Sequence, residues 1–292
     1  RKVSLPTYSF EKTKYPVIVD ATKIIADLIS NKSLINSKEL SDWFHIPTWE
    51  VSTLINNNIS SLEKKCNIIF LDNGGIGNEL RVKFEQNGER AICIEKGKTF
   101  SQKNESNFEI NPELEEDYTK LFEIIGNKNS YRIIFTWGIS NDTNKKIAIN
   151  QLRKSLDNCY YSLLNIVKTI SSSERTNTEI VAITNNLHAV LTTDQISPEK
   201  SPLLGALKVI PKEYSNIIRC QNIDIILSEN DDELIENLFK EIISGSQNHS
   251  VAYRNKTRFI EAIKSIKLPN VGDSTSSFIS GGVYLVTGGI GG

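Results

Sequence analysis

Apolar, β-branched runs alternate with amphipathic stretches from about residue 67 onward, and this alternation restricts the possible folds more than any other feature of the sequence. A short run that is apolar throughout is typical of a strand buried on both faces of a sheet. The amphipathic stretches between such runs suit helices that pack on the sheet. The pattern therefore predicts an α/β fold with a mainly parallel sheet flanked by helices.

The first repeating unit is the clearest one. We expect a buried strand over residues 67–72, a tight turn over 73–77 and a helix over 78–86 that Gly88 ends. Further strands are expected at residues 91–94, 131–137, 179–184, 220–226, 249–253, 257–263 and 283–287. Further helices are expected at residues 111–125, 156–170 and 231–245, the first of them capped by Asn111.

The charge balance excludes two classes of partner. The chain of 292 residues carries 34 Lys and Arg against 35 Asp and Glu, a formal net charge of −1, with no long run of one sign. Nucleic acid and anionic membranes are therefore poor partners. No stretch reaches the roughly 20 apolar residues of a membrane span, and the first residues are too polar for a secretion signal. We expect a cytoplasmic location, and because the chain begins with Arg1 instead of Met, a fragment of a longer protein.

The cysteines and histidines show no pattern of a metal or catalytic site. The four cysteines are widely spaced, with no CxxC pair, and are expected to be reduced thiols: Cys66, Cys93, Cys159 and Cys220. The three histidines are interpreted as ordinary surface or hydrogen-bonded residues: His45, His188 and His249. We predict no metal site.

A glycine-rich run follows the last predicted strand and matches the opening of a dinucleotide-binding loop. In such loops the glycines let the backbone approach a pyrophosphate, and the next helix adds the attraction of its dipole. The candidate cofactor-binding residues are Thr287, Gly288, Gly289, Gly291 and Gly292. Because the chain does not include the following helix, we expect at most feeble nucleotide binding. The alternative is a flexible glycine-rich tail.

Residues 69–77 repeat the design of residues 285–291, with a strand that leads into a glycine-rich turn. This first turn could also bind a nucleotide. However, Asn78 stands where a small residue is expected, and Glu95 is the only candidate for an acidic partner of the ribose. We therefore favour a turn retained for packing.

A short-chain reductase needs a Tyr-x-x-x-Lys pair, in which the Lys lowers the phenol pKa so that the Tyr can protonate the substrate oxygen. We interpret the candidate tyrosines, Tyr8, Tyr118 and Tyr214, as unrelated to such a pair. The prediction is therefore that this chain contains no catalytic residue.

Several segments, in the correct order, resemble parts of modular polyketide synthases. Residues 3–12 are similar to an inter-domain linker, and residues 42–49 to the segment that opens the structural subdomain of a ketoreductase. The most specific segment is Pro202–Tyr214, whose apolar content also indicates burial. Together with residues 282–289 these segments extend the resemblance over essentially the whole chain.

The resemblance implies a truncated Rossmann-like fold that supports a second, catalytic half of the ketoreductase. It implies a linker at residues 1–41 after an acyltransferase or ketosynthase, the structural subdomain at 42–281, and the start of the catalytic subdomain at 282–292. That catalytic half would use NADPH to reduce a β-ketoacyl group on an acyl carrier protein, within a homodimeric parent that contains neighbouring synthase domains. The catalytic Ser, Tyr and Lys of the family would lie beyond Gly292.

Two other functions stay open from the sequence. One is a free-standing nucleotide-dependent reductase that uses the turn at Gly74. The other is an interaction module whose linker and exposed aromatic residues dock neighbouring domains or the carrier protein. Trp49 and Trp137 are expected to be core or interface aromatics, because large aromatic side chains dominate core packing.

Overall fold

The computed structural model describes residues 43–54, 65–126, 130–140, 149–171, 177–227, 232–267 and 279–287. The predicted linker at residues 1–41 lies outside these residues. The chain forms two compact units, residues 47–263 and residues 1–46 with 264–292. Among the described helices, none is both long and apolar enough to cross a membrane.

A ten-stranded sheet runs through the larger unit in the order β1-β10-β9-β8-β7-β6-β2-β3-β5-β4. The pairs from β5 to β9 are all parallel, whereas β4 pairs antiparallel with β5, and β10 with β9. The predicted mainly parallel sheet is therefore confirmed. The strands are β1 (His45–Val51), β2 (Cys66–Phe70), β3 (Ala91–Lys96), β4 (Ser101–Asn104), β5 (Asn107–Ile110), β6 (Tyr131–Gly138), β7 (Thr178–Asn185), β8 (Ile217–Ile225), β9 (Ser250–Arg254) and β10 (Thr257–Ser265).

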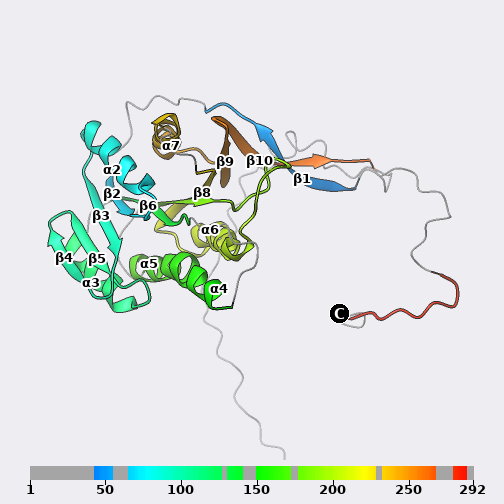
Figure 1. Cartoon of the computed structure of the whole chain (residues 1–292), viewed down its shortest axis with the longest axis horizontal. Helices are drawn as coiled ribbons and strands as arrows, with labels where there is room; N and C mark the ends of the chain where they lie inside the picture. Colours follow the sequence, from blue (N-terminus) through cyan, green and yellow to red (C-terminus); the bar gives the residue numbers. More distant parts are fainter. Residues whose placement is uncertain are drawn as a thin grey trace, which may run out of the picture. The chain divides into compact units, whose positions relative to one another are not determined.

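Helices cover both faces of this sheet (Figure 1). Helices α2 and α7 pack together on one face, and α3, α5 and α6 lie on the other. The connection from β3 to β5 carries the strand β4 where the other parallel connections carry helices. The helical elements are α2 (Ile76–Gln86), α3 (Glu115–Ile125), α4 (Ile149–Leu156), the π-helix η4 (Asp157–Tyr161), α5 (Ser162–Ser171), the 3-10 turn η5 (Pro198–Lys200), α6 (Pro202–Glu213) and α7 (Asp232–Ser244).

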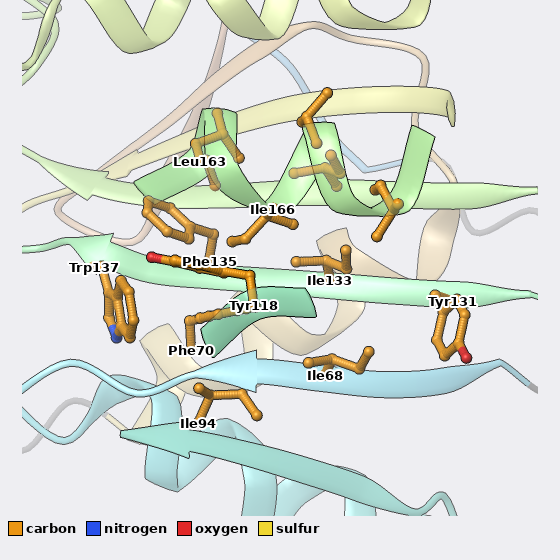
Figure 2. Packing of buried hydrophobic residues seen from close by; sticks show 14 of the residues in the cluster. Ile68, Phe70, Ile94, Tyr118, Tyr131, Ile133, Phe135, Trp137, Leu163 and Ile166 are labelled. Atoms are coloured by element: carbon orange, nitrogen blue, oxygen red, sulfur yellow. The ribbon is translucent and has the colours of Figure 1, made fainter. Parts of the chain in front are cut away.

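Alternate residues of the central strands enter two separate cores. Figure 2 shows Ile68 and Phe70 of β2 beside Phe135 of β6, on the face that α3 and α5 cover. Ile69 and Ile134 point to the opposite face, toward α2 and α7. Because successive strand residues point to opposite faces, a strand covered by helices on both sides must be apolar throughout. This is the physical reason for the continuous apolar runs in the sequence.

The structure corrects two of the predicted helices. Helix α3 begins at Glu115 instead of near Asn111, because the Asn111 Oδ1 accepts the Glu113 N–H at 3.0 Å and holds a turn before the helix. The helix predicted over residues 156–170 is longer and contains the π-helix η4 between α4 and α5. The hairpin of β4 and β5 was not predicted, since its polar strand Ser101–Asn104 lies exposed at the sheet edge.

The strand predicted at residues 283–287 is wrong for this chain. These residues have no strand structure, and the side chains of Val283 and Leu285 are 99% and 94% exposed. A strand needs a neighbour for its backbone hydrogen bonds, and none of the described residues supplies one. Within the same unit, the Gly282 N–H donates to the Ile279 carbonyl at 2.9 Å and closes a turn.

Candidate functional site

A cavity of about 900 Å³ lies at the carboxyl ends of the central strands. The connection from β2 leads to β3 on one side, and the connection from β6 leads to β7 on the other side. Such a reversal leaves a crevice at the carboxyl edge of an open parallel sheet. Residues that end or follow four strands line it: Asp72 after β2, Lys96 of β3, Trp137 of β6 and Asn186 after β7.

The π-helix η4 and the turn η5 form the other wall of the cavity. Lys154 of α4, Asn158 and Cys159 of η4, and Lys200 of η5 line this side. The backbone of η4 stays in place because Ser162 Oγ donates to the Asp157 carbonyl at 2.6 Å. π-Helical turns are frequent at functional sites.

The first glycine-rich turn is closed by a side chain of the protein itself. The Asp72 carboxylate accepts the Gly74 N–H at 2.8 Å and the Gly77 N–H at 2.7 Å. Gly75 has a φ of 96°, which favours glycine and lets the chain turn into α2. Thr136 Oγ1 accepts the Asp72 N–H at 2.9 Å and holds Asp72 in position.

The Asp72 carboxylate thus accepts hydrogen bonds from the backbone N–H groups that a pyrophosphate would need as donors. A pyrophosphate at this turn would have to displace the carboxylate or lie beside a like charge. Glu95, the candidate ribose partner, is not among the cavity-lining residues and pairs instead with Lys103 at 2.7 Å. The arrangement supports the interpretation of this turn as a packing element.

Lys96 is a partly buried ionisable group in the wall of the cavity. Its Nζ lies 5.0 Å from the centre of the Trp137 ring, a cation–π contact. Trp137 is held in place because its Nε1–H donates to the Leu71 carbonyl at 3.0 Å. Burial lowers the pKa of Lys96 to about 8.

Two other groups that line the cavity, Lys200 and Cys159, are buried. Lys200 donates to the Asn185 carbonyl at 2.9 Å and to Asn185 Oδ1 at 2.6 Å. Burial raises the pKa of the Cys159 thiol to about 12, which keeps it neutral and weakly nucleophilic at pH 7. All four cysteines are free and buried, as expected.

His188 belongs to a structural network outside the cavity. Its ring Nε2 lies 2.9 Å from Asn222 Oδ1, and its ring packs against Trp49 at 4.9 Å between centroids. Burial lowers the pKa of His188. This confirms a hydrogen-bonded histidine. Among the described residues, no three His, Cys, Asp or Glu side chains are grouped as a metal site requires.

The predicted cofactor motif falls at the limit of the described residues. Thr287 is exposed, whereas Gly288, Gly289, Gly291 and Gly292 lie outside them. The sequence holds one pair that the prediction overlooked: Tyr8 and Lys12 do have the Tyr-x-x-x-Lys spacing, and they too lie outside the described residues.

A second tyrosine pair was also overlooked. Tyr161 and Asn165 have the related Tyr-x-x-x-Asn spacing, but neither of them lines the cavity. Both pairs could have been found in the sequence from the four-residue spacing of the tyrosine and its partner.

A family model described as "Beta-ketoacyl synthase-like, N-terminal" matches residues 66–244. The match begins with the first residue of β2 and ends with the last residue of α7, so it covers most of the chain. The chain belongs to this family. A search of curated proteins finds no match to the chain.

Solved structures of ketoreductases have the same fold as this chain. One match is the multidomain structure of a keto acid-selecting NRPS module, which contains adenylation, ketoreductase and pseudo Asub domains. It is 20% identical in sequence, has a TM-score of 0.67, and the match covers 85% of this chain and 20% of that one. An N-terminal ketoreductase from the macrolactin assembly line is 15% identical, with a TM-score of 0.63, over 84% of this chain and 51% of that one. A C2-type ketoreductase from a modular polyketide synthase is 12% identical, with a TM-score of 0.52, over 77% and 44%.

These matches confirm the predicted Rossmann-like fold, which the chain shares with solved ketoreductases. The chain spans about a fifth of the first structure and about half of the second.

Proposed function

We propose that this chain is the non-catalytic, supporting half of a polyketide synthase ketoreductase. Its catalytic half would bind NADPH and reduce a β-ketoacyl group on an acyl carrier protein. The observation that carries this proposal is the Asp72 carboxylate, which accepts hydrogen bonds from the Gly74 and Gly77 amides of the glycine-rich turn that the structure describes. The turn has the shape of a cofactor-binding loop, but the Asp72 side chain takes the place that a phosphate would occupy. This supports a structural role for the chain.

The extent of the matches supports a two-part reductase. The chain accounts for 51% of the macrolactin ketoreductase and 44% of the C2-type ketoreductase. The unmatched half of such a protein would then supply the cofactor site and the catalytic groups. The neighbouring synthase domains and a second copy of the parent chain are the other partners that this proposal includes.

The segment from residue 282 would begin the catalytic half. Val283 and Leu285 are 99% and 94% exposed, and contact with the catalytic half would bury these apolar residues. Thr287, Gly288, Gly289, Gly291 and Gly292 would then contact the pyrophosphate of NADPH. In this proposal residues 42–281 are the structural subdomain and residues 1–41 the linker that precedes it.

The test is a reconstitution of the reductase from its two halves. The 292-residue chain is titrated with NADPH by calorimetry and assayed with a model β-ketoacyl thioester, alone and after co-expression with the polypeptide that follows it in the parent. We expect no binding tighter than millimolar and no turnover by the chain alone, and turnover when both halves are present.

The matched variant is Asp72→Asn, which removes the negative charge of the turn and replaces one of its two acceptor oxygens with a donor. We expect it to leave the reconstituted activity within about twofold, since the turn lies outside the catalytic half. Micromolar NADPH binding by the wild-type chain alone, or reduction of the thioester without the second half, would show that the chain is an enzyme in its own right.

A further inference from the structure

The cavity at the carboxyl edge of the sheet contains a cation that makes no ion pair with the residues that the structure describes. The Lys96 Nζ lies 5.0 Å from the centre of the Trp137 ring, and the Asp72 carboxylate acts on it electrostatically without forming a hydrogen bond or ion pair with it. An ammonium group taken partly out of water is costly unless it is paired. An anion in the cavity would offset this cost.

The charges that line the cavity also favour an anion. Three lysines, Lys96, Lys154 and Lys200, stand against two carboxylates, Asp72 and Glu199. Both carboxylate oxygens of Asp72 already accept backbone N–H groups. The Glu199 Oε2 is buried and has no hydrogen-bond partner among the described residues, so its charge opposes the lysines, which still outnumber the two carboxylates.

The shape of the cavity sets the size of the ligand. A volume of about 900 Å³ is within the range of small-molecule sites. The side chains of Ser140, Gln151 and Asn158 add hydrogen-bonding groups to the lining. A dinucleotide is disfavoured, because Asp72 fills the amides that its pyrophosphate would require.

We propose that this cavity is a binding site for a small organic oxyanion, a carboxylate or a phosphate ester, whose negative group pairs with the Lys96 ammonium. The site goes beyond the supporting role proposed above, since it would give the non-catalytic half of the reductase a ligand of its own. A bound oxyanion would also contact η4 and η5, which form the opposite wall.

The pH dependence of binding follows from the surroundings of Lys96. The ionisable groups that face it come from every wall: Asp72, Lys154, Cys159, Glu199 and Lys200. Burial lowers the pKa of Lys96 to about 8, so the ammonium is lost as the pH rises through 8. Affinity for a carboxylate is therefore expected to be constant between about pH 6 and 7 and to fall about tenfold per pH unit above 8, whereas a phosphate ester also gains negative charge near its second pKa of about 6.

The experiment measures the pKa of Lys96 in the 292-residue chain by NMR after ¹³C-methylation of its lysines, with inorganic phosphate and with acetate as probes. At saturation with a probe that binds, we expect the pKa of Lys96 to rise toward the ordinary value of about 10.4. A rise with phosphate alone identifies a phosphate ester as the ligand class, and a rise with acetate alone identifies a carboxylate.

Three variants make the result decisive. Lys96→Gln should lower the affinity for the probe at least tenfold, and Lys96→Arg should retain it, which shows that the charge and not the fold is responsible. Lys98→Gln removes the same charge from an exposed position of the next loop and should change nothing. The proposal is overturned if neither probe moves the pKa of Lys96, or if Lys96→Gln binds as tightly as the wild type.

Discussion

Arg254 shows how single residues stabilise this sheet, because a fully buried guanidinium finds a partner for each of its nitrogens. Its Nε donates to Asp194 at 2.9 Å and its Nη2 to Asp224 Oδ2 at 2.7 Å, while Nη1 donates to the Asp224 carbonyl at 3.1 Å. Asp224 also accepts the backbone N–H groups of Leu187 and His188. The loop after β7 is thereby held against β8 and β9.

Replacing Asp224 with Asn is therefore expected to destabilise the protein strongly. The Asn side chain would leave the Arg254 charge buried without its closest partner and would turn one acceptor into a donor. We expect the free energy of unfolding to fall by about 3–5 kcal/mol. Urea unfolding followed by circular dichroism measures this change.

The control is Glu233→Gln, which breaks the exposed ion pair with Lys256. A loss below about 1 kcal/mol is expected there, since exposed pairs contribute little. Equal losses for the two variants would show that the network around Asp224 is no more important than a surface pair.

At the scale of elements, β6 and β7 approach each other closely at Gly138, where β6 ends at the cavity. The register of the two strands shifts between Phe135 and Gly138. A Cβ at Gly138 would lie 2.8 Å from Thr184 Cγ2 and 3.2 Å from the Ile183 carbonyl oxygen. Because one of these neighbours is backbone of the next strand, the sheet itself would have to move.

The variant Gly138→Ala is expected to lower the free energy of unfolding by about 1–3 kcal/mol through overpacking. Gly205→Ala is the matched substitution, because Gly205 lies inside α6 with no atom within 4 Å of its added Cβ. It should stabilise the protein by up to about 1 kcal/mol, since Ala is the better helix former. Thermal unfolding of both variants compares them, and a stabilising Gly138→Ala would contradict the close approach of the strands.

At the scale of the whole molecule, a buried charge cluster ties the amino ends of the central strands together. Glu179 of β7 lies 2.8 Å from Lys65 before β2, 3.6 Å from Arg132 of β6 and 3.9 Å from Arg219 of β8. Burial alone would raise the pKa of Glu179, but these three cations outweigh it and lower the pKa below its ordinary value of 4.5. The charged form of Glu179 is thus favoured by folding.

This cluster predicts a particular loss of stability in acid. A carboxyl group whose pKa is lowered by folding contributes stability above its unfolded pKa, and this contribution disappears as the pH falls through the folded pKa. Glu179→Gln should be less stable than the wild type by about 3–5 kcal/mol at pH 7. The difference should shrink as the pH falls below about 4.5.

Urea unfolding at several pH values between 7 and 3 measures this difference. Glu115→Gln, which breaks an exposed pair with Lys168 at 3.3 Å, is the control and should cost less than about 1 kcal/mol at every pH. A gap between Glu179→Gln and the wild type that stays constant over this range would rule out the lowered pKa.

The strands and helices of the central sheet could be predicted well because their signals are local. The apolar run at residues 67–72 predicts a strand, and the apolar stripe in residues 231–245 predicts a helix. The structure has β2 and α7 there. The π-helix η4 could not be predicted, since Ser162 and its neighbours form an ordinary helical pattern. The polar strand β4 carries no apolar alternation at all.

The candidate site was less predictable than the fold. The assignment of Thr287 and the glycines after it to a cofactor site stays a prediction from spacing, and a spacing does not show which groups are already satisfied. Asp72 and Lys96 illustrate this limit, because one closes its own turn and the other meets Trp137, a residue 41 positions later in the chain.

The order of apolar and amphipathic segments was enough to establish the α/β class and the parallel sheet, since these depend on periodicity within each segment. The family resemblance came instead from particular segments, above all Pro202–Tyr214. Folding added everything that depends on two distant segments meeting: the carboxylate in the glycine-rich turn, the unpaired lysine in the cavity and the absence of a strand at residues 283–287. A strand or a binding site exists only when its partner groups are in place, and those partners are chosen by the three-dimensional arrangement of the chain.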